Sequence, residues 1–109
     1  MKTQIGYLSF FALVLSAVAF ANEVRNLPQV NKITDGQPEE VIAFIVRIVE
    51  CNHWAGEEPY DKERAKQIRK AIENARCNSL ALEEKAFDLK YKENKKVLDA
   101  IGKAKELNM

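Results

Sequence analysis

The stretch that decides the fold is Val41-Ile42-Ala43-Phe44-Ile45-Val46-Arg47-Ile48-Val49-Glu50-Cys51. Most of its apolar side chains fall on one broad helical stripe: Val41, Ile42, Phe44, Ile45, Ile48, Val49 and Cys51. Pro38 suits the first position of a helix, and the acidic residues after it complement the positive end of the helix dipole. Many β-branched residues would also suit a buried strand, but the length of the run and the proline before it favour a helix. We therefore predict a central helix from Pro38 to Cys51.

This helix ends at one of only two cysteines in the chain, and the other is Cys77. In an exported chain, two cysteines are most simply a disulfide. The pair closes a loop of 26 residues, which contributes about 3.5 kcal/mol in the chain-entropy model. A redox-active or metal-binding pair is the alternative, although redox pairs usually have the much closer C-x-x-C spacing.

The disulfide constrains the path of the chain between the two cysteines. Asp61 is a good N-cap for a second helix over residues 61–76, so each cysteine would follow the end of a helix. A plain helical hairpin would place the sulfurs at opposite ends, too far apart to bond. Residues 52–60 are therefore predicted to form a loop that runs along the domain before the second helix begins.

Two more helices complete the predicted all-α fold of four helices. One covers residues 80–92, with Leu82, Ala86 and Leu89 on one face. Phe87 and Tyr91 adjoin that face and are expected to be core residues rather than part of a ligand site. The other helix begins after the cap residue Asn94. The apolar stripe of the last helix is Val97, Leu98, Ile101 and Ala104. Residues 38–109 form the predicted helical domain. Residues 22–37 are predicted to be an irregular N-terminal arm, which should lie against the core because Val24, Leu27, Val30 and Ile33 recur every three residues.

Residues 1–21 have the three parts of a signal peptide in the right order. Lys2 supplies the positive charge, an uncharged and largely apolar run follows from Ile5 to Phe20, and Ala19-Phe20-Ala21 gives the small-x-small pattern before the cleavage site. The alternative is a membrane anchor, for which the run is short. We expect cleavage after Ala21 and export to the periplasm or the extracellular medium. We expect no membrane span after cleavage.

The charge of the chain points to no polyanionic partner. Without Lys2 the 17 basic residues become 16, which equals the 16 acidic residues. A protein that binds nucleic acid through its phosphates needs a basic surface, so we predict no nucleic-acid partner. The sequence predicts neither a cofactor nor an oligomeric state.

The residues with the most chemical variety lie between Cys51 and Asp61. They are His53, Trp54, Glu57, Glu58 and Tyr60, and they include the only His and the only Trp of the chain. Aromatic anchors of this kind are enriched at interface hot spots, so this set is the candidate binding surface for a protein partner. The alternative is that Trp54 and Tyr60 fold inward and cover the second helix, whose apolar face is mostly alanine.

A metal-binding protein or a metal-dependent enzyme centred on His53 is a second hypothesis. His53 could ligate a metal or act as a base beside Glu57 or Glu58. A single His with loop carboxylates has no recognised ligand spacing. The alternative to a metal or catalytic role is a structural one, in which the His53 ring packs on Trp54. No nucleophile motif and no phosphate-binding glycine loop is present in the sequence, so we predict no catalytic residue.

The segment from Cys77 through Leu80, Leu82, Leu89 and Tyr91 resembles part of the small cysteine-bearing helical domain of periplasmic lysozyme-inhibitor-like proteins. In this chain the upstream cysteine is more distant than in that pattern, and no cysteine follows Cys77. The resemblance implies a lysozyme-inhibitor-like periplasmic protein as a further alternative. The leading prediction is a small exported interaction protein without enzymatic activity.

Overall fold

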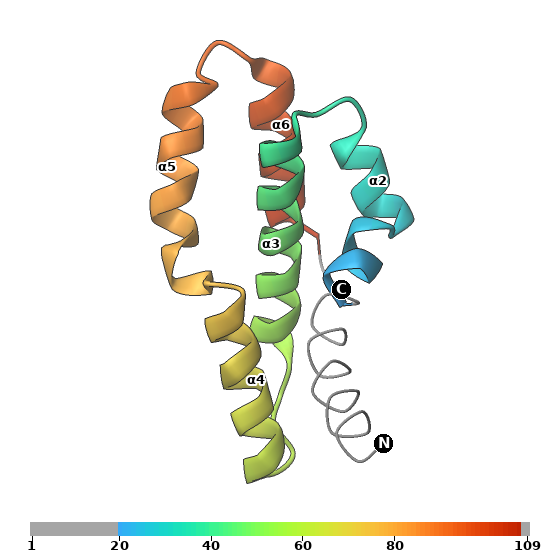
Figure 1. Ribbon diagram of the computed structural model, residues 1–109, viewed down its shortest axis with the longest axis vertical. Coiled ribbons are helices and arrows are strands. Elements are labelled where there is room, and N and C mark those ends of the chain that lie inside the picture. The colour runs from blue at the N-terminus through green and yellow to red at the C-terminus, as the bar shows by residue number, and fades with distance from the viewer. Residues whose placement is uncertain (1–19, 108–109) are drawn as a thin grey trace, which may run out of the picture.

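The computed structural model describes residues 20–107, and this part of the chain contains helices and no strand. Residues 20–25 are helical, and the later elements are α2 (Pro28–Thr34), α3 (Glu39–Gly56), α4 (Lys62–Asn74), the 3-10 helix η1 (Cys77–Ser79), α5 (Leu80–Lys90) and α6 (Lys95–Lys105) (Figure 1). The predicted all-α fold is therefore confirmed. Most of the predicted signal peptide, residues 1–19, lies outside the described residues.

The helix α3 lies at the centre of the molecule, with α2 and α6 packed against it and α5 farther out (Figure 1). Val41, Ile45 and Val49 on α3 are completely buried, as the apolar run predicted. They meet Val97, Ala100, Ile101 and Ala104 of α6, so the predicted stripe of the last helix also faces the core. Pro38 is the cap residue just before α3 rather than its first residue.

Residues 22–37 are not the irregular arm that the sequence predicted. Residues 20–25 and 28–34 are helical, and Pro28 occupies the first turn of α2, where a missing N–H costs nothing. Thr34 donates its hydroxyl proton to the Val30 carbonyl at 2.9 Å, so this buried polar group is satisfied inside the helix. The segment does lie against the core as expected, because Val24 and Val30 are buried.

The prediction of a loop over residues 52–60 is also wrong at its start, because α3 continues past Cys51 to Gly56. Only residues 57–61 link α3 to α4, and the backbone is extended at Glu57 and Asp61. Asp61 caps α4 as predicted, since its carboxylate accepts from the Arg64 N–H at 2.8 Å.

The layout that the disulfide demanded is nevertheless present. Beyond Cys51 the chain runs down through the last turn of α3 and the linker, and α4 then returns upward to η1 (Figure 1). The stretch 52–61 covers about 24 Å, enough for the return of α4, which is about 20 Å long. The predicted path along the domain is therefore made of a helical turn followed by an extended linker.

The helix α5 packs Phe87 and the adjoining Tyr91, both partly buried, against the core as the sequence predicted, but not the predicted apolar stripe. Leu82 and Leu89 are 73% and 74% exposed, so the stripe that they form with Ala86 faces solvent. Phe87 faces inward instead and stacks on Phe44 of α3, with ring centroids 4.5 Å apart. Apolar residues lie on both faces of α5, so periodicity alone could not identify the buried one.

The last helix, α6, begins where the sequence predicted. The Asn94 side chain accepts a hydrogen bond from the Val97 N–H at 3.2 Å. None of the helices within residues 20–107 combines the length and the apolar composition needed to cross a membrane.

Candidate functional site

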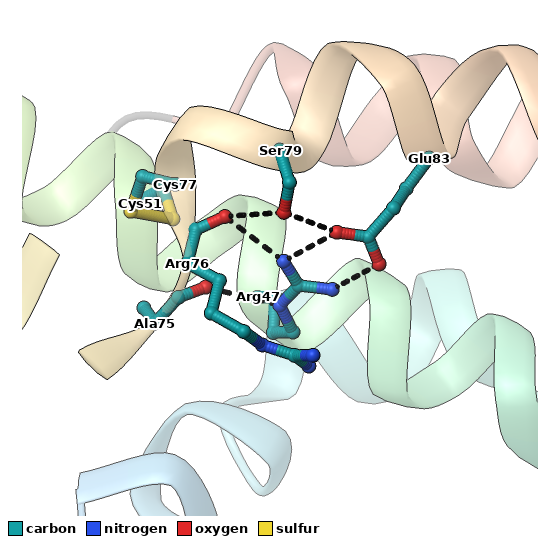
Figure 2. Close-up of polar contacts among 7 residues, drawn as sticks. All are labelled: Arg47, Cys51, Ala75, Arg76, Cys77, Ser79 and Glu83. Atoms are coloured by element: carbon teal, nitrogen blue, oxygen red, sulfur yellow. Dashed lines mark hydrogen bonds and ion pairs between the residues drawn. A yellow bond between two sulfur atoms is a disulfide. The ribbon is translucent and has the colours of Figure 1, made fainter. Parts of the chain in front are cut away.

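Cys51 and Cys77 form the predicted disulfide. Their Cα atoms are 5.7 Å apart, within the range that a disulfide requires. Cys51 lies on α3 and Cys77 begins η1, directly after the turn that ends α4 (Figure 2). The bond therefore fixes the C-terminal end of α4 to the side of α3.

A charged cluster next to the disulfide fastens the same junction. The Arg47 guanidinium donates to both carboxylate oxygens of Glu83, at 2.6 and 2.9 Å, and to the carbonyls of Ala75 and Arg76 at 3.0 and 3.1 Å (Figure 2). Ser79 adds a hydroxyl donor to Glu83 at 2.6 Å. Arg47 thus satisfies carbonyls that follow the end of α4 and at the same time holds α5.

These donors make Glu83 an unusually strong acid. The hydrogen bonds from Arg47 and Ser79 lower the pKa of Glu83 to about 2, because they favour the ionised carboxylate. The sequence pattern did not predict that Arg47, Ser79 and Glu83 come together. The one signal was Arg47 itself, a cation within the apolar run 41–51, which needs a partner if it is to be half-buried.

The candidate residues His53 and Trp54 lie on the last turn of α3 rather than on a loop. Their ring centroids are 4.9 Å apart in an edge-to-face arrangement, and the ring of Phe20 lies 5.4 Å from His53 and 5.5 Å from Trp54. The Arg64 guanidinium lies 5.5 Å from the centre of the Trp54 ring, within cation–π range. We call Phe20, His53, Trp54, Glu57 and Arg64 together the aromatic end.

Glu57 is the polar link of the aromatic end. One of its carboxylate oxygens is 3.4 Å from His53 Nε2, and the other is 3.5 Å from an Arg64 guanidinium nitrogen. The side chains of His53, Glu57 and Arg64 are 25%, 32% and 24% exposed, so the group is partly covered yet reachable from solvent. The contact between the His53 and Trp54 rings agrees with the structural alternative for His53, in which its ring packs on Trp54.

Glu58 and Tyr60 do not join this group. Both are exposed residues of the linker, and Tyr60 is 81% exposed. The alternative that Trp54 and Tyr60 both fold inward over α4 is therefore wrong for Tyr60, whereas the half-buried Trp54 does lie against Arg64 of α4. The structure brings together three of the five candidate residues and leaves the other two on the adjacent linker.

A hollow of about 760 Å³ lies beside the aromatic end, between the N-terminal helical segment and α3. Its described lining combines the apolar residues Phe20, Val24 and Leu27 with His53 and with the polar residues Asn22, Glu23 and Asn26. Apolar hollows with a few polar groups are the usual form of a binding site.

Within residues 20–107, no three side chains among His, Cys, Asp and Glu come close enough together to hold a metal ion. His53 has one carboxylate neighbour, Glu57, and the nearby Cys51 is committed to the disulfide. The described geometry therefore adds nothing to the metal hypothesis beyond that single pair.

Comparison with known proteins found no matching family model, no matching curated protein and no matching solved structure. The resemblance of residues 77–91 to lysozyme-inhibitor-like proteins accordingly stays a prediction. What the chain does has to be argued from its own residues.

Proposed function

We propose that this chain is a small exported protein without enzymatic activity, which recognises a partner protein through Tyr60 and the residues of the aromatic end that cleavage leaves in place, His53, Trp54, Glu57 and Arg64. Export is supported by the signal-peptide pattern of residues 1–21 and by the disulfide, a bond that persists in oxidising compartments. The proposed compartment is the periplasm or the extracellular medium.

The observation that carries the proposal is the position of the two largest candidate anchors. Tyr60 is 81% exposed, and Trp54 belongs neither to the buried core nor to the apolar side chains packed against it. Large aromatic side chains that the core does not require are typical of interface hot spots, because a partner can bury them at little cost in conformational entropy.

The surroundings of these anchors suit a stable recognition surface. The disulfide and the Arg47 cluster fix the far end of α4, and Glu57 and Arg64 tie the near end to Trp54. Tyr60 lies on a linker with both ends held by helices. A surface that is ordered before binding loses less entropy on association.

The test is capture of a partner from the exported fraction of the producing cells by the immobilised mature protein. Tyr60→Ala should reduce recovery of the partner about tenfold or more, as expected for an aromatic hot spot. The matched control is Leu89→Ala, which truncates an equally exposed apolar side chain on α5 and should leave recovery unchanged. Equal recovery with wild type and Tyr60→Ala, both with native circular dichroism spectra, would refute the proposal.

A further inference from the structure

The ring of Phe20 completes a three-ring cluster with His53 and Trp54. It meets the His53 ring at an interplanar angle of 42° and the Trp54 ring at 51°, both in the tilted range that aromatic pairs favour. Phe20 is partly buried and packs against the edge of the hydrophobic core. The site beside the touching rings of His53 and Trp54 is thus already occupied by an aromatic side chain of the same chain.

The predicted cleavage site lies directly after this contact. Cleavage after Ala21 removes Phe20 and makes Asn22 the first residue, two positions before Val24, which is 1% exposed. The Asn22 carbonyl accepts from the Asn26 backbone N–H at 3.1 Å and from its side-chain amide at 2.8 Å. These contacts do not involve residues 1–21, so the new N-terminus stays against the core while the ring of Phe20 leaves.

The rings of His53 and Trp54 do not depend on Phe20 for their positions. Trp54 keeps the Arg64 guanidinium at 5.5 Å, and His53 keeps Glu57 at 3.4 Å and the edge of Trp54. Val24 and Leu27 remain as apolar walls of the adjoining hollow. Removal of Phe20 therefore leaves an aromatic-sized gap with preformed walls rather than a collapsed surface.

We propose that signal-peptide cleavage empties the slot that Phe20 fills beside the touching rings of His53 and Trp54, and that the partner protein packs an aromatic side chain against both rings in its place. This inference rests on the proposed function and names the chemistry of the partner at the aromatic end. The geometry favours an aromatic ring over an aliphatic side chain, because the occupant shown in the structure is a ring in tilted contact with two others. Asn22, Glu23 and Asn26, which also line the hollow, offer polar groups to the backbone of the partner segment.

The test uses the mature exported protein and a short peptide that restores the lost residues. The probe is the capped tetrapeptide Val-Ala-Phe-Ala, the sequence of residues 18–21, and the matched control peptide has Ala in place of Phe. Trp54 is the only Trp of the chain, so its fluorescence reports directly on the slot. We expect a saturable shift of Trp54 emission in the millimolar range with the Phe peptide and none with the Ala peptide.

A variant separates the slot from unspecific contact with the peptide. His53→Ala removes one wall and should weaken binding of the Phe peptide about tenfold, while Leu89→Ala, on the exposed face of α5, should leave that affinity unchanged. Equal responses to the two peptides, or no response to either, would overturn the inference. An unchanged affinity of folded, oxidised His53→Ala protein would overturn it as well.

The outcome also separates this inference from the proposed function. If Tyr60→Ala loses the partner but the Phe peptide does not bind, the recognition surface stands and the slot fails. If the Phe peptide binds and Tyr60→Ala retains the partner, the slot stands and the proposed function through Tyr60 fails.

Discussion

Arg47 and Cys51 lie one helical turn apart on α3 and hold the same junction between α4 and α5. Cys51 does so through its covalent bond to Cys77, and Arg47 through hydrogen bonds to the carbonyls of Ala75 and Arg76. Arg76 in this junction has a positive φ of 54°, a conformation that non-glycine residues rarely adopt. The covalent and the polar tie together keep this turn in place and so orient α4.

Arg47→Ala should lower the free energy of unfolding by about 2–3 kcal/mol, because it removes the guanidinium donors of the Glu83 carboxylate and of the Ala75 and Arg76 carbonyls. Urea unfolding of the oxidised mature protein measures the change. The control is Lys105→Ala, which breaks the more exposed ion pair with Glu84 and should cost less than about 1 kcal/mol. Equal losses for the two variants would contradict the role of Arg47.

Stability should fall in acid between about pH 4.5 and pH 2. The pKa of Glu83 is about 2 in the folded protein against an ordinary value of 4.5, so the folded state binds this proton less readily than the unfolded state does. The stabilisation is complete above pH 4.5 and is lost as the pH falls through the folded pKa. Hydrogen bonds from Lys90 and Tyr91 lower the pKa of Glu40 and act in the same direction.

Glu50 opposes this trend, because burial raises its pKa and protonation therefore favours the folded state. Urea unfolding at a series of acid pH values, with Glu83→Gln as the comparison, measures how much of the loss of stability comes from Glu83. The variant should be less stable at neutral pH and should lose less stability on acidification. Parallel curves for wild type and Glu83→Gln would show that Glu83 does not carry the effect.

Removal of the disulfide should act mainly on α4. Cys51→Ala combined with Cys77→Ala releases a 26-residue constraint, with an expected loss of about 3.5 kcal/mol in the chain-entropy model. Helix α4 contacts α3 and η1. The core cluster of α2, α3 and α6, in contrast, does not include the disulfide. Amide exchange should accelerate over residues 62–79 far more than over residues 41–49. A uniform acceleration would argue against a local role.

Processing should yield a mature chain that begins at Asn22. Intact mass measurement of the exported protein should give residues 22–109 less two hydrogens for the disulfide. Reduction should add the two hydrogens back. An exported or membrane-bound form that retains residues 1–21 would contradict the predicted cleavage and leave Phe20 in place.

The sequence predicted the fold well where one face of a helix carries all its apolar residues. The runs of α3 and α6 and the caps Asp61 and Asn94 are examples, and the cysteine pair gave the correct path of the chain. It was right about Phe87 on α5 but wrong about Leu82 and Leu89, which lie on the other side of that helix and face solvent. Only the packing of α5 on α3 decides which side faces the core.

The candidate site was also predicted only in part, because some of its residues come together only through packing. The variety of residues between Cys51 and Asp61 drew attention to His53, Trp54 and Glu57, which the structure brings together. Phe20 and Arg64 were missed because they lie far away in sequence and reach Trp54 only after α4 returns and the N-terminal segment folds onto α3. The spacing of Val24, Leu27 and Val30 did predict contact with the core, but the polar residues between them concealed the helices.

The most direct measurement of the proposed function is photo-crosslinking in the producing cells, with a benzophenone amino acid placed at position 60 in one strain and at position 89 in another. Both positions carry exposed side chains on the surface of the same protein, Tyr60 beside the aromatic end and Leu89 on α5. The proposal predicts a defined crosslinked partner from position 60 and none from position 89. Crosslinks of equal yield from both positions, or from position 89 alone, would contradict it.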